Sequence, residues 1–582
     1  MGVGPVLCDG TQASEREERP ARQSPGTESM LDAVVIGSGP NGLAAANVLA
    51  DAGWQVVVLE AQPEPGGAVR SDRMLDPAFV SDLFSSFYPL AAVSPVLRGF
   101  ALEDHGLRWS RAGTVIAHPL LDGRCAALYP TVAETVEHLA DQFGAADARA
   151  WNELYRLWET VGDQLMALLF SPRPSPAALV RFARRLRSAG ALKTLRFLTL
   201  PARRMAEEAF AGQGPALLLA GCAVHADLLP DAAGSGLMGW MMAMLGQQVG
   251  WPVPVGGAGE LTGALVRRLR AKGGALVCNA RVSEIVVGGH RAVGVRTEDG
   301  TRYRVGRAVL ADVAAPALYG QLLPERHRVE LDSFQWDPAT FKIDWSLSEP
   351  IPWTAAEAVP AGAVHLGAHL DDLSDHALRV ATGRMPRELF AILGQMTAAD
   401  PSRSPRGTQA AWAYTHLPHR GAAGRGEPAG GWSEDEVRAM ADRLEAQVER
   451  FAPGFRDVVG ARRIWTPARL EAMNENLVGG AIGGGTSNIH QQLLFRPHSG
   501  LGGPRTPVAG LYLASAAAHP GGGVHGVCGA NAARAALLDR SVLGRAVYGP
   551  GRSALRRAVT GPAGFTTADH RGTEEGTHPH GS

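Results

Sequence analysis

The sequence predicts an α/β fold built from at least two packed parts, and three observations support this prediction. Residues 32–60 read as a strand, a helix and a second strand. Residues 510–538 repeat the order of strand, glycine loop and Ala-rich helix. The chain has 582 residues, of which 45% are hydrophobic, and this is enough for more than one ordinary domain.

The first strand-helix-strand unit contains a glycine pattern typical of nucleotide binding. In DAVVIGSGPNGLAAANVLADAGWQVVVLE, the G-x-G-x-x-G motif is Gly37, Gly39 and Gly42, between a Val-rich strand and an Ala-rich helix. The first glycine allows the tight turn, the second admits a pyrophosphate and the third lets helix and strand pack. Glu60 ends the second strand, where a carboxylate accepts hydrogen bonds from ribose hydroxyls. We therefore expect a dinucleotide at this turn.

Two further glycine clusters lie at similar positions. Gly66 and Gly67 follow the second strand in EPGGAVRSD. Near the C-terminus, HPGGGVHGVCGAN follows a strand predicted at 511–514 and precedes a helix. Three consecutive glycines carry a large entropic cost, so we expect a ligand to approach the bare backbone there.

Several motifs together resemble the phytoene desaturase-related flavoproteins, and within them the branch called pyridine nucleotide-disulfide oxidoreductase domain-containing protein 2. The resemblance covers roughly residues 30–545. Its motifs are DAVVIGSGPNGLAAA, EPGGA, WPVPVGGAGELTGALVRRL, NARVSEIVVGGHRAVGVRTEDG, MNENLVGGAIGGG and GLYLASAAAHPGGGVHGVCGANAA.

The resemblance implies FAD, held by a discontinuous Rossmann-like domain of the glutathione-reductase type beside a mixed α+β substrate domain. The implied FAD-binding segments are 30–129, 251–320 and 501–548, and the implied substrate segments are 130–250 and 321–500. The pyrophosphate is expected at Gly37, Gly39, Pro40, Asn41 and Gly42, the ribose at Glu60, the second phosphate near Gly66 and Gly67, adenine at the backbone of Val282, and the ribityl chain and pyrimidine edge at Gly521, Gly522, Gly523 and Val524.

His525, inside the C-terminal glycine loop, is the candidate catalytic residue. An imidazole beside a helix start would donate a proton or stabilise the anionic reduced flavin. The alternative is a histidine that caps or packs the helix, and His519 and Cys528 are weaker candidates. Ser515 departs from the family pattern, where glycine is usual, which puts close backbone approach there in doubt.

The substrate segments contain two informative stretches. GLMGWMMAMLGQQVGWP is rich in Met and Trp, which suits either an adaptable surface for an apolar ligand or a core helix. The glycines of 479–485 are expected to line the flavin or substrate cavity, although relatives often have Asp at the position of Ala481.

The expected function is an FAD-dependent oxidoreductase that moves a hydride from an apolar small molecule to flavin N5. A redox-neutral flavin-dependent isomerase or saturase and a flavin-stabilised regulatory protein are the alternatives. A second nucleotide-binding unit for NAD(P)H and a C-x-x-C dithiol are both absent from the sequence. Electrons are therefore expected to leave to oxygen or a quinone-like acceptor.

Charge and cysteine usage limit the partners. Lys and Arg number 56 against 57 Asp and Glu, which argues against a nucleic-acid partner. Five scattered cysteines indicate no metal site and fit a cytoplasmic setting. Residues 173–204 carry nine basic residues and no acid, so this segment either contacts an anionic membrane peripherally or is a solvated helical face.

The two ends of the chain are polar and read as disordered tails. These are residues 1–29 and 549–582, and Met30 is a plausible start of the folded part. The HPH near the C-terminus reads as a solvated pair of histidines.

Overall fold

The computed structural model describes residues 30–171, 176–419 and 432–540, so both predicted tails lie outside the described residues. Its first sheet has five parallel strands from distant parts of the chain. Their order is β9 (Ala275–Val277), β2 (Val56–Leu59), β1 (Leu31–Ile36), β12 (Arg302–Ala311) and β18 (Leu511–Leu513). The predicted discontinuous Rossmann-like arrangement is confirmed, because this sheet is assembled from three separate segments.

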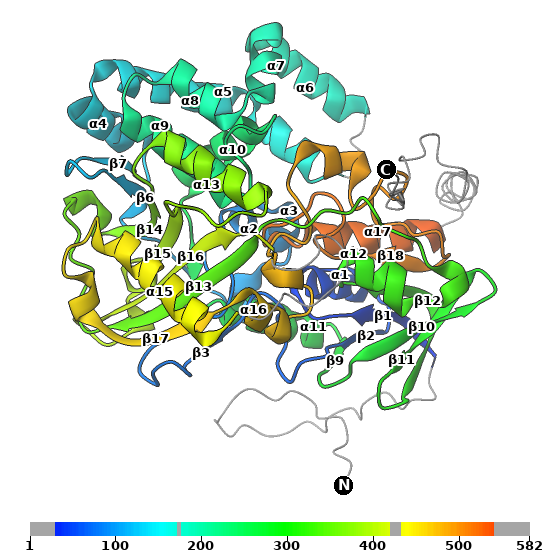
Figure 1. Cartoon of the computed structure of the whole chain (residues 1–582). Coiled ribbons are helices and arrows are strands. Elements are labelled where there is room, and N and C mark those ends of the chain that lie inside the picture. The colour runs from blue at the N-terminus through cyan, green and yellow to red at the C-terminus, as the bar shows by residue number, and fades with distance from the viewer. Residues whose placement is uncertain (1–29, 172–175, 420–431, 541–582) are drawn as a thin grey trace, which may run out of the picture.

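Both faces of this sheet are buried. In β1, Ala33 and Val35 face one core, whereas Val34 and Ile36 face another. Helices α1 (Pro40–Asp51), α11 (Gly259–Ala271) and α17 (Val527–Arg540) contribute to the first core (Figure 1). On the other side, β10 (Val282–Gly288), β11 (Arg291–Thr297) and the start of β12 form an antiparallel meander.

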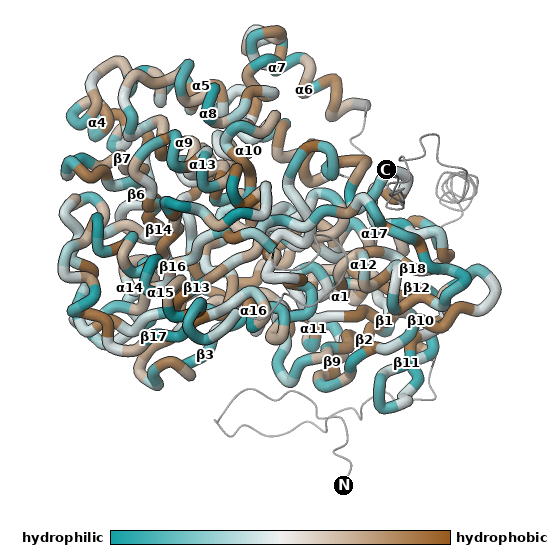
Figure 2. The backbone as a smooth tube through the Cα atoms, viewed as in Figure 1, coloured by the Kyte–Doolittle hydropathy of each residue, from teal (hydrophilic) through white to brown (hydrophobic). Residues whose placement is uncertain are grey.

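The second sheet has seven strands and belongs to the substrate half. Its order is β17 (Val459–Trp465), β13 (Ala339–Leu347), β16 (Gln409–Leu417), β15 (Ala391–Gln395), β14 (Ala361–Leu366), β6 (Thr114–Pro119) and β7 (Cys125–Leu128). The last two strands fall within the expected first FAD-binding segment, 30–129, yet they pair in this sheet. Hydrophobic stretches, brown in Figure 2, run through the strands of both sheets.

The apolar residues of β13 alternate, as expected for a strand. Phe341, Ile343 and Trp345 pack with Met440 and Leu444 of α15 (Glu434–Glu449). The other face of the sheet meets helices α9 (Gln213–His225) and α13 (Leu370–Ala381) through a separate apolar cluster.

The described residues of 130–250 are mostly helical, as predicted, and lie at the top of Figure 1. Besides α9 they form α4 (Val132–Phe143), α5 (Ala145–Leu169), α6 (Pro176–Ser188), α7 (Ala191–Thr199), α8 (Ala202–Ala209) and α10 (Ser235–Val249). The Met- and Trp-rich stretch is α10. Its Trp240 is fully buried against Trp158 and Phe197, which supports the core-helix alternative.

The remaining α-helices and β-strands of the described residues are short. They are the helices α2 (Pro89–Val93), α3 (Pro95–Gly99), α12 (Ala315–Ala317), α14 (Met396–Ala399) and α16 (Pro467–Met473), and the two-stranded pairs β3 (Ser71–Asp72) with β4 (Ser81–Asp82) and β5 (Trp109–Ser110) with β8 (Val253–Pro254).

Candidate functional site

A cleft of about 1410 Å³ opens at the carboxyl ends of the parallel strands of the first sheet. Ligands of open α/β sheets bind at this edge, where loops from neighbouring strands diverge. The cleft exceeds the roughly 300–1,000 Å³ of ordinary ligand pockets, so it has room for a cofactor and a second molecule.

The G-x-G-x-x-G turn forms one wall of the cleft. Gly37 has a φ of +89°, which favours glycine, and α1 begins at Pro40 after Gly39, which has no side chain to cap the helix. A Cβ atom on Gly39 would lie 2.7 Å from Asp312 Oδ2. The side-chain oxygen of Asn41 is buried without a partner. A helix start whose amides have no capping side chain fits a pyrophosphate, whereas the orphaned Asn41 oxygen is an acceptor and does not contribute to that fit.

The second glycine pair lies against the first. A Cβ atom on Gly67, whose φ is +55°, would lie 3.0 Å from Gly39 Cα, and Gly67 lines the cleft. Gly66 lies behind it, where a Cβ atom would meet Val69 O at 2.6 Å. The two glycine loops therefore form one bare-backbone wall.

Glu60 lies in the cleft with its carboxylate fixed by the chain. Its Oε2 accepts hydrogen bonds from the Ser38 amide at 2.8 Å and hydroxyl at 2.5 Å, and its Oε1 accepts from the Gln62 amide at 2.9 Å. This orientation leaves the carboxylate at the place where a dinucleotide ribose is expected.

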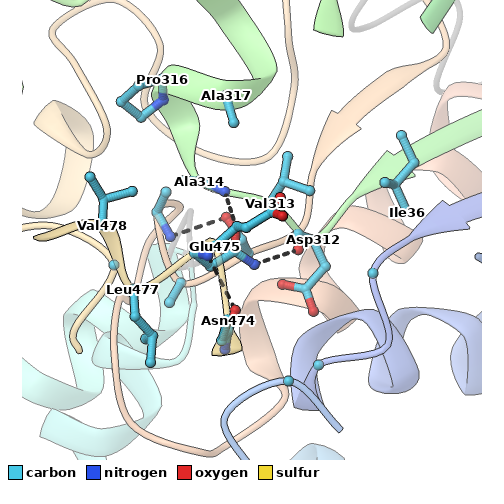
Figure 3. Close-up of a pocket in the computed structure, with 18 of the residues that line it drawn as sticks. Ile36, Asp312, Val313, Ala314, Pro316, Ala317, Asn474, Glu475, Leu477 and Val478 are labelled. Atoms are coloured by element: carbon cyan, nitrogen blue, oxygen red, sulfur yellow. Dashed lines mark hydrogen bonds between the residues drawn. The ribbon is translucent and has the colours of Figure 1, made fainter. Parts of the chain in front are cut away.

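Asp312, at the carboxyl end of β12, was not among the residues predicted from the sequence (Figure 3). Its Oδ2 accepts a 2.7 Å hydrogen bond from the Gly42 amide in the first turn of α1. Burial, opposed by this hydrogen bond and assisted by the nearby charge of Glu60, raises the pKa of Asp312 to about 7. A polar residue directly after an apolar strand is the signal that would have found it.

The loop after α16 is held against the same strand end (Figure 3). Asn476 Oδ1 accepts a hydrogen bond from the Ala314 amide at 2.8 Å, and its Nδ2 donates to Asp312 O at 3.1 Å. The neighbouring Glu475 forms an ion pair with Arg281. Arg281 precedes Val282, and both line the cleft where the adenine is expected.

The glycine loop of 479–485 borders the cleft, as predicted, through Ile482 and Gly484. Asp337 accepts hydrogen bonds at 2.6 Å from the amides of Ile482 and Gly483, and at 3.1 Å from that of Gly485. A buried carboxylate thus fixes the turn.

Arg496 holds the opposite side of this loop. Its fully buried guanidinium donates to the carbonyls of Gly483, Gly485 and Thr486 at 2.9–3.2 Å, and to that of Ala516 at 3.0 Å. The last bond links the glycine loop to the C-terminal loop. No local sequence pattern indicated this role.

The C-terminal loop completes the cleft. Gly522, Gly523 and Val524 line it, whereas Gly521 lies against Arg496. Ser515 also lines the cleft, and its hydroxyl accepts a hydrogen bond from the Ala517 amide at 3.2 Å.

His525 lies beside the cleft but is not part of its lining. Its Nδ1 accepts a 3.0 Å hydrogen bond from the Val527 amide at the start of α17, and its ring packs against Phe170. Burial lowers the pKa of His525 to about 4. These contacts favour the capping and packing alternative over a protonated group.

The two weaker candidates are also buried. Burial lowers the pKa of His519, and it raises that of the Cys528 thiol to about 12. Neither residue lines the cleft.

Ten of the thirteen predicted cofactor residues line the cleft, and the other three, Gly42, Gly66 and Gly521, support it from behind. Among the described residues, no cluster of three or more His, Cys, Asp or Glu side chains is arranged to hold a metal ion. In the same part of the chain, no helix is long and apolar enough to cross a bilayer.

Comparisons with known proteins agree with this geometry. The mouse pyridine nucleotide-disulfide oxidoreductase domain-containing protein 2 is 28% identical over 87% of this chain and 93% of its own. The neurosporene-forming phytoene desaturase of Rhodobacter capsulatus is 24% identical over the same shares of the two chains. The predicted resemblance to phytoene desaturase-related flavoproteins is thereby confirmed.

An oxidoreductase structure from Methanosarcina mazei shares the fold, with a TM-score of 0.54 and 17% identity over 87% of this chain and all of that one. A family model described as flavin containing amine oxidoreductase matches residues 41–333, which is half of the chain. The cleft and these matches together identify the chain as an FAD-dependent oxidoreductase, and it belongs to the flavin-containing amine oxidoreductase family.

Proposed function

We propose that the enzyme oxidises a C–H bond of an apolar small molecule. The observation that carries this proposal is the wall of the cleft beyond the predicted cofactor residues. Apolar side chains from three segments lie there, namely Val313, Pro316, Ala317, Leu322, Val329, Leu331, Phe334, Trp336, Leu477, Val478 and Ile482. Phe334 and Trp336 pack edge to face with ring centroids 4.8 Å apart. These side chains support an apolar ligand, and the charged side chains of Glu325, Arg328, Glu330 and Asp332 line the cleft as well.

FAD supplies the hydride acceptor when it is bound, and the chain supplies position and environment. The glycine walls would hold the nucleotide end, and Glu60 would accept hydrogen bonds from its ribose. The apolar wall would exclude water and align the substrate. Because alignment over a ring contributes more to hydride transfer than a base does, this chemistry does not require an acid–base residue.

Anaerobic mixing of the FAD-loaded protein with candidate substrates tests the proposal. We expect an apolar substrate, added in an amount close to that of the bound flavin, to bleach the flavin absorbance. If the substrate is converted without net reduction of the flavin, the reaction is a redox-neutral isomerisation and not an oxidation. A flavin that no apolar compound reduces would favour a regulatory protein. The mass of any molecule that co-purifies with the chain narrows the choice of compounds.

We also propose that helices α6 and α7 contact an anionic membrane surface, which would bring apolar substrate to the enzyme. The side chains of Leu179, Val180, Leu192 and Leu195 are half-exposed or more. Five exposed cations on the two helices form no ion pair within the described residues, namely Arg181, Arg184, Arg185, Arg187 and Lys193. The mixed apolar and basic surface supports this contact.

A further inference from the structure

A second, smaller cavity of about 220 Å³ lies in the substrate half, between the end of α9, helix α13 and the end of β16. Its walls are mainly apolar and include Val224, Leu228, Ala377, Val380 and Leu417. An apolar protein cavity of about 150 Å³ is large enough for benzene, so this space suits a molecule with one ring or a short branched chain.

Seven polar side chains also line the cavity, and three of them, Asp227, His416 and His376, have buried atoms without a well-aligned hydrogen-bond partner. Asp227, where the chain turns after α9 with a φ of +61°, lies with its Oδ1 3.1 Å from His416 Nε2. The two atoms are close but poorly aligned for a hydrogen bond, and neither has another partner. His416 Nδ1 is also buried without a partner. His416 is 3% exposed, so its ring has little contact with bulk solvent.

The third polar side chain is His376 of α13, which is 1% exposed. Its Nδ1 lies 3.2 Å from the Phe390 amide and 3.4 Å from Glu388 O. Accepting from the amide, which is the shorter contact, places the ring proton on Nε2. That Nε2 has no partner. Burial lowers the pKa of His376 to about 3 and keeps the ring neutral. The cavity therefore contains a buried N–H donor without an acceptor, as well as a carboxylate oxygen without a well-aligned donor.

Unpaired buried groups are costly, and native proteins usually satisfy them with a ligand, an ion or water. A metal ion does not fit, because the described side chains form no such cluster here. A hydroxyl group does fit, because it donates one hydrogen bond and accepts others. It would donate to Asp227 and accept from His376, while an apolar body fills the rest of the space.

We propose that this cavity binds a small, mainly apolar molecule through one hydroxyl group, recognised by Asp227, His416 and His376. Trp336 lines both this cavity and the cofactor cleft. A Cβ atom on Gly483, in the loop that borders the cleft, would lie 3.4 Å from Asp227 Oδ2. The role of such a ligand in turnover rests on the proposed function, whereas its binding does not.

The experiment compares two fluorinated probes of matched shape, 4-fluorophenol and 4-fluorotoluene, which differ by a hydroxyl in place of a methyl group. Their dissociation constants with the FAD-loaded protein are measured by fluorine NMR titration. We expect the phenol to bind about tenfold more tightly, because one hydrogen bond is worth up to this factor. Asp227→Asn and His376→Phe should each reduce the preference to about twofold, and Asp371→Asn, exposed on the same helix, should retain it.

Ala377→Leu, which fills the cavity from α13, should weaken both probes, and FAD absorbance shows whether each variant is folded. Equal affinity for the two probes would overturn the proposal. A preference for the phenol that neither Asp227→Asn nor His376→Phe changes would also overturn it. Absence of binding to the FAD-loaded protein would mean that the cavity holds water only, and would also overturn it. Anaerobic bleaching of the flavin is recorded separately. Bleaching by an apolar substrate without a hydroxyl preference would contradict this inference alone, whereas probe binding without any substrate oxidation would contradict the proposed function alone.

Discussion

The carboxyl group of Asp312 is buried beneath the first turn of α1, close to the carboxylate of Glu60. Burial raises its pKa to about 7, whereas aspartate in an unfolded chain titrates near 4. The folded protein therefore binds one more proton than the unfolded chain between pH 4 and 7. The contribution of this extra proton to the free energy of unfolding is complete below pH 4 and is lost as the pH rises through 7.

Asp312→Asn should remove this part of the pH dependence. The asparagine oxygen still accepts the Gly42 hydrogen bond but does not ionise. In urea unfolding of the FAD-free protein, we expect wild type to lose about 3 kcal/mol of unfolding free energy relative to the variant between pH 5 and pH 8, since this range covers about two pKa units below the folded pKa, each worth about 1.4 kcal/mol. Asp141→Asn, at an exposed position, serves as the control. Parallel pH profiles for wild type and Asp312→Asn would contradict this assignment.

His525 shows how the structure changes a prediction made from the sequence. Because its Nδ1 caps the Val527 amide and its ring is buried, His525→Ala should lose about 1 kcal/mol of stability and release FAD more readily. The midpoint potential of the remaining bound flavin should change little. Bound FAD and the potential are measured on the same sample. A lowered potential with full FAD would instead restore the role in stabilising reduced flavin.

The role of a single residue could be predicted where it follows from the residues next to it in the sequence. Gly37, Gly39 and Glu60 lie within one strand-helix-strand unit, and the cleft contains all three. Asp312 acts on Gly42 from 270 positions away, and Arg496 acts through main-chain carbonyls, which leave no trace in the sequence. Contacts of this kind depend on the tertiary fold and were missed.

At the scale of elements, the glycine loop is shaped by the two buried charges that hold it. Arg496→Met should leave four carbonyl groups without their donor and cost at least about 3 kcal/mol of unfolding free energy. FAD retention should fall with it, because the loop borders the cleft. Arg124→Met, which removes an exposed ion pair, should cost less than about 1 kcal/mol. Similar losses in the two variants would show that Arg496 does not shape the loop.

Helices α6 and α7 are the elements expected to touch a membrane. Arg196, Arg203 and Arg204 form ion pairs with acidic residues of α8 and α13, so only part of the basic segment is available, and Arg173 lies outside the described residues. In liposome co-sedimentation at low salt, we expect binding to anionic vesicles that Arg184→Glu/Arg185→Glu weakens at least tenfold, since each cation near the surface contributes roughly 1 kcal/mol. Arg98→Glu/Arg149→Glu is the control. Binding that ignores anionic lipid would contradict the proposal.

For the whole molecule, the cleft joins segments that are far apart in the sequence, so FAD should stabilise the fold as a unit. Free FAD at one hundred times its dissociation constant adds about 2.7 kcal/mol. We expect thermal unfolding of wild type to shift upward with added FAD and that of Gly39→Val to stay constant, because valine would fill the space at the pyrophosphate turn. Gly99→Val, where a Cβ atom meets nothing within 4 Å, should behave as wild type. An FAD-dependent shift in Gly39→Val would mean that the turn is misassigned.

Because β18 pairs with β12, the first sheet cannot be completed until the C-terminal part of the chain has been synthesised. The first strand leaves the ribosome early, but β18 and α17, which complete the same sheet and its helical cover, follow more than 470 residues later. At about 5–20 residues per second, this delay is roughly 25–95 s. During that time the side of α1 that packs against α17 and the edge of β12 that pairs with β18 have no final partner, so we expect the nascent chain to expose this apolar surface. Because residues 522–524 of the C-terminal loop line the cleft, we expect FAD to bind after synthesis is complete.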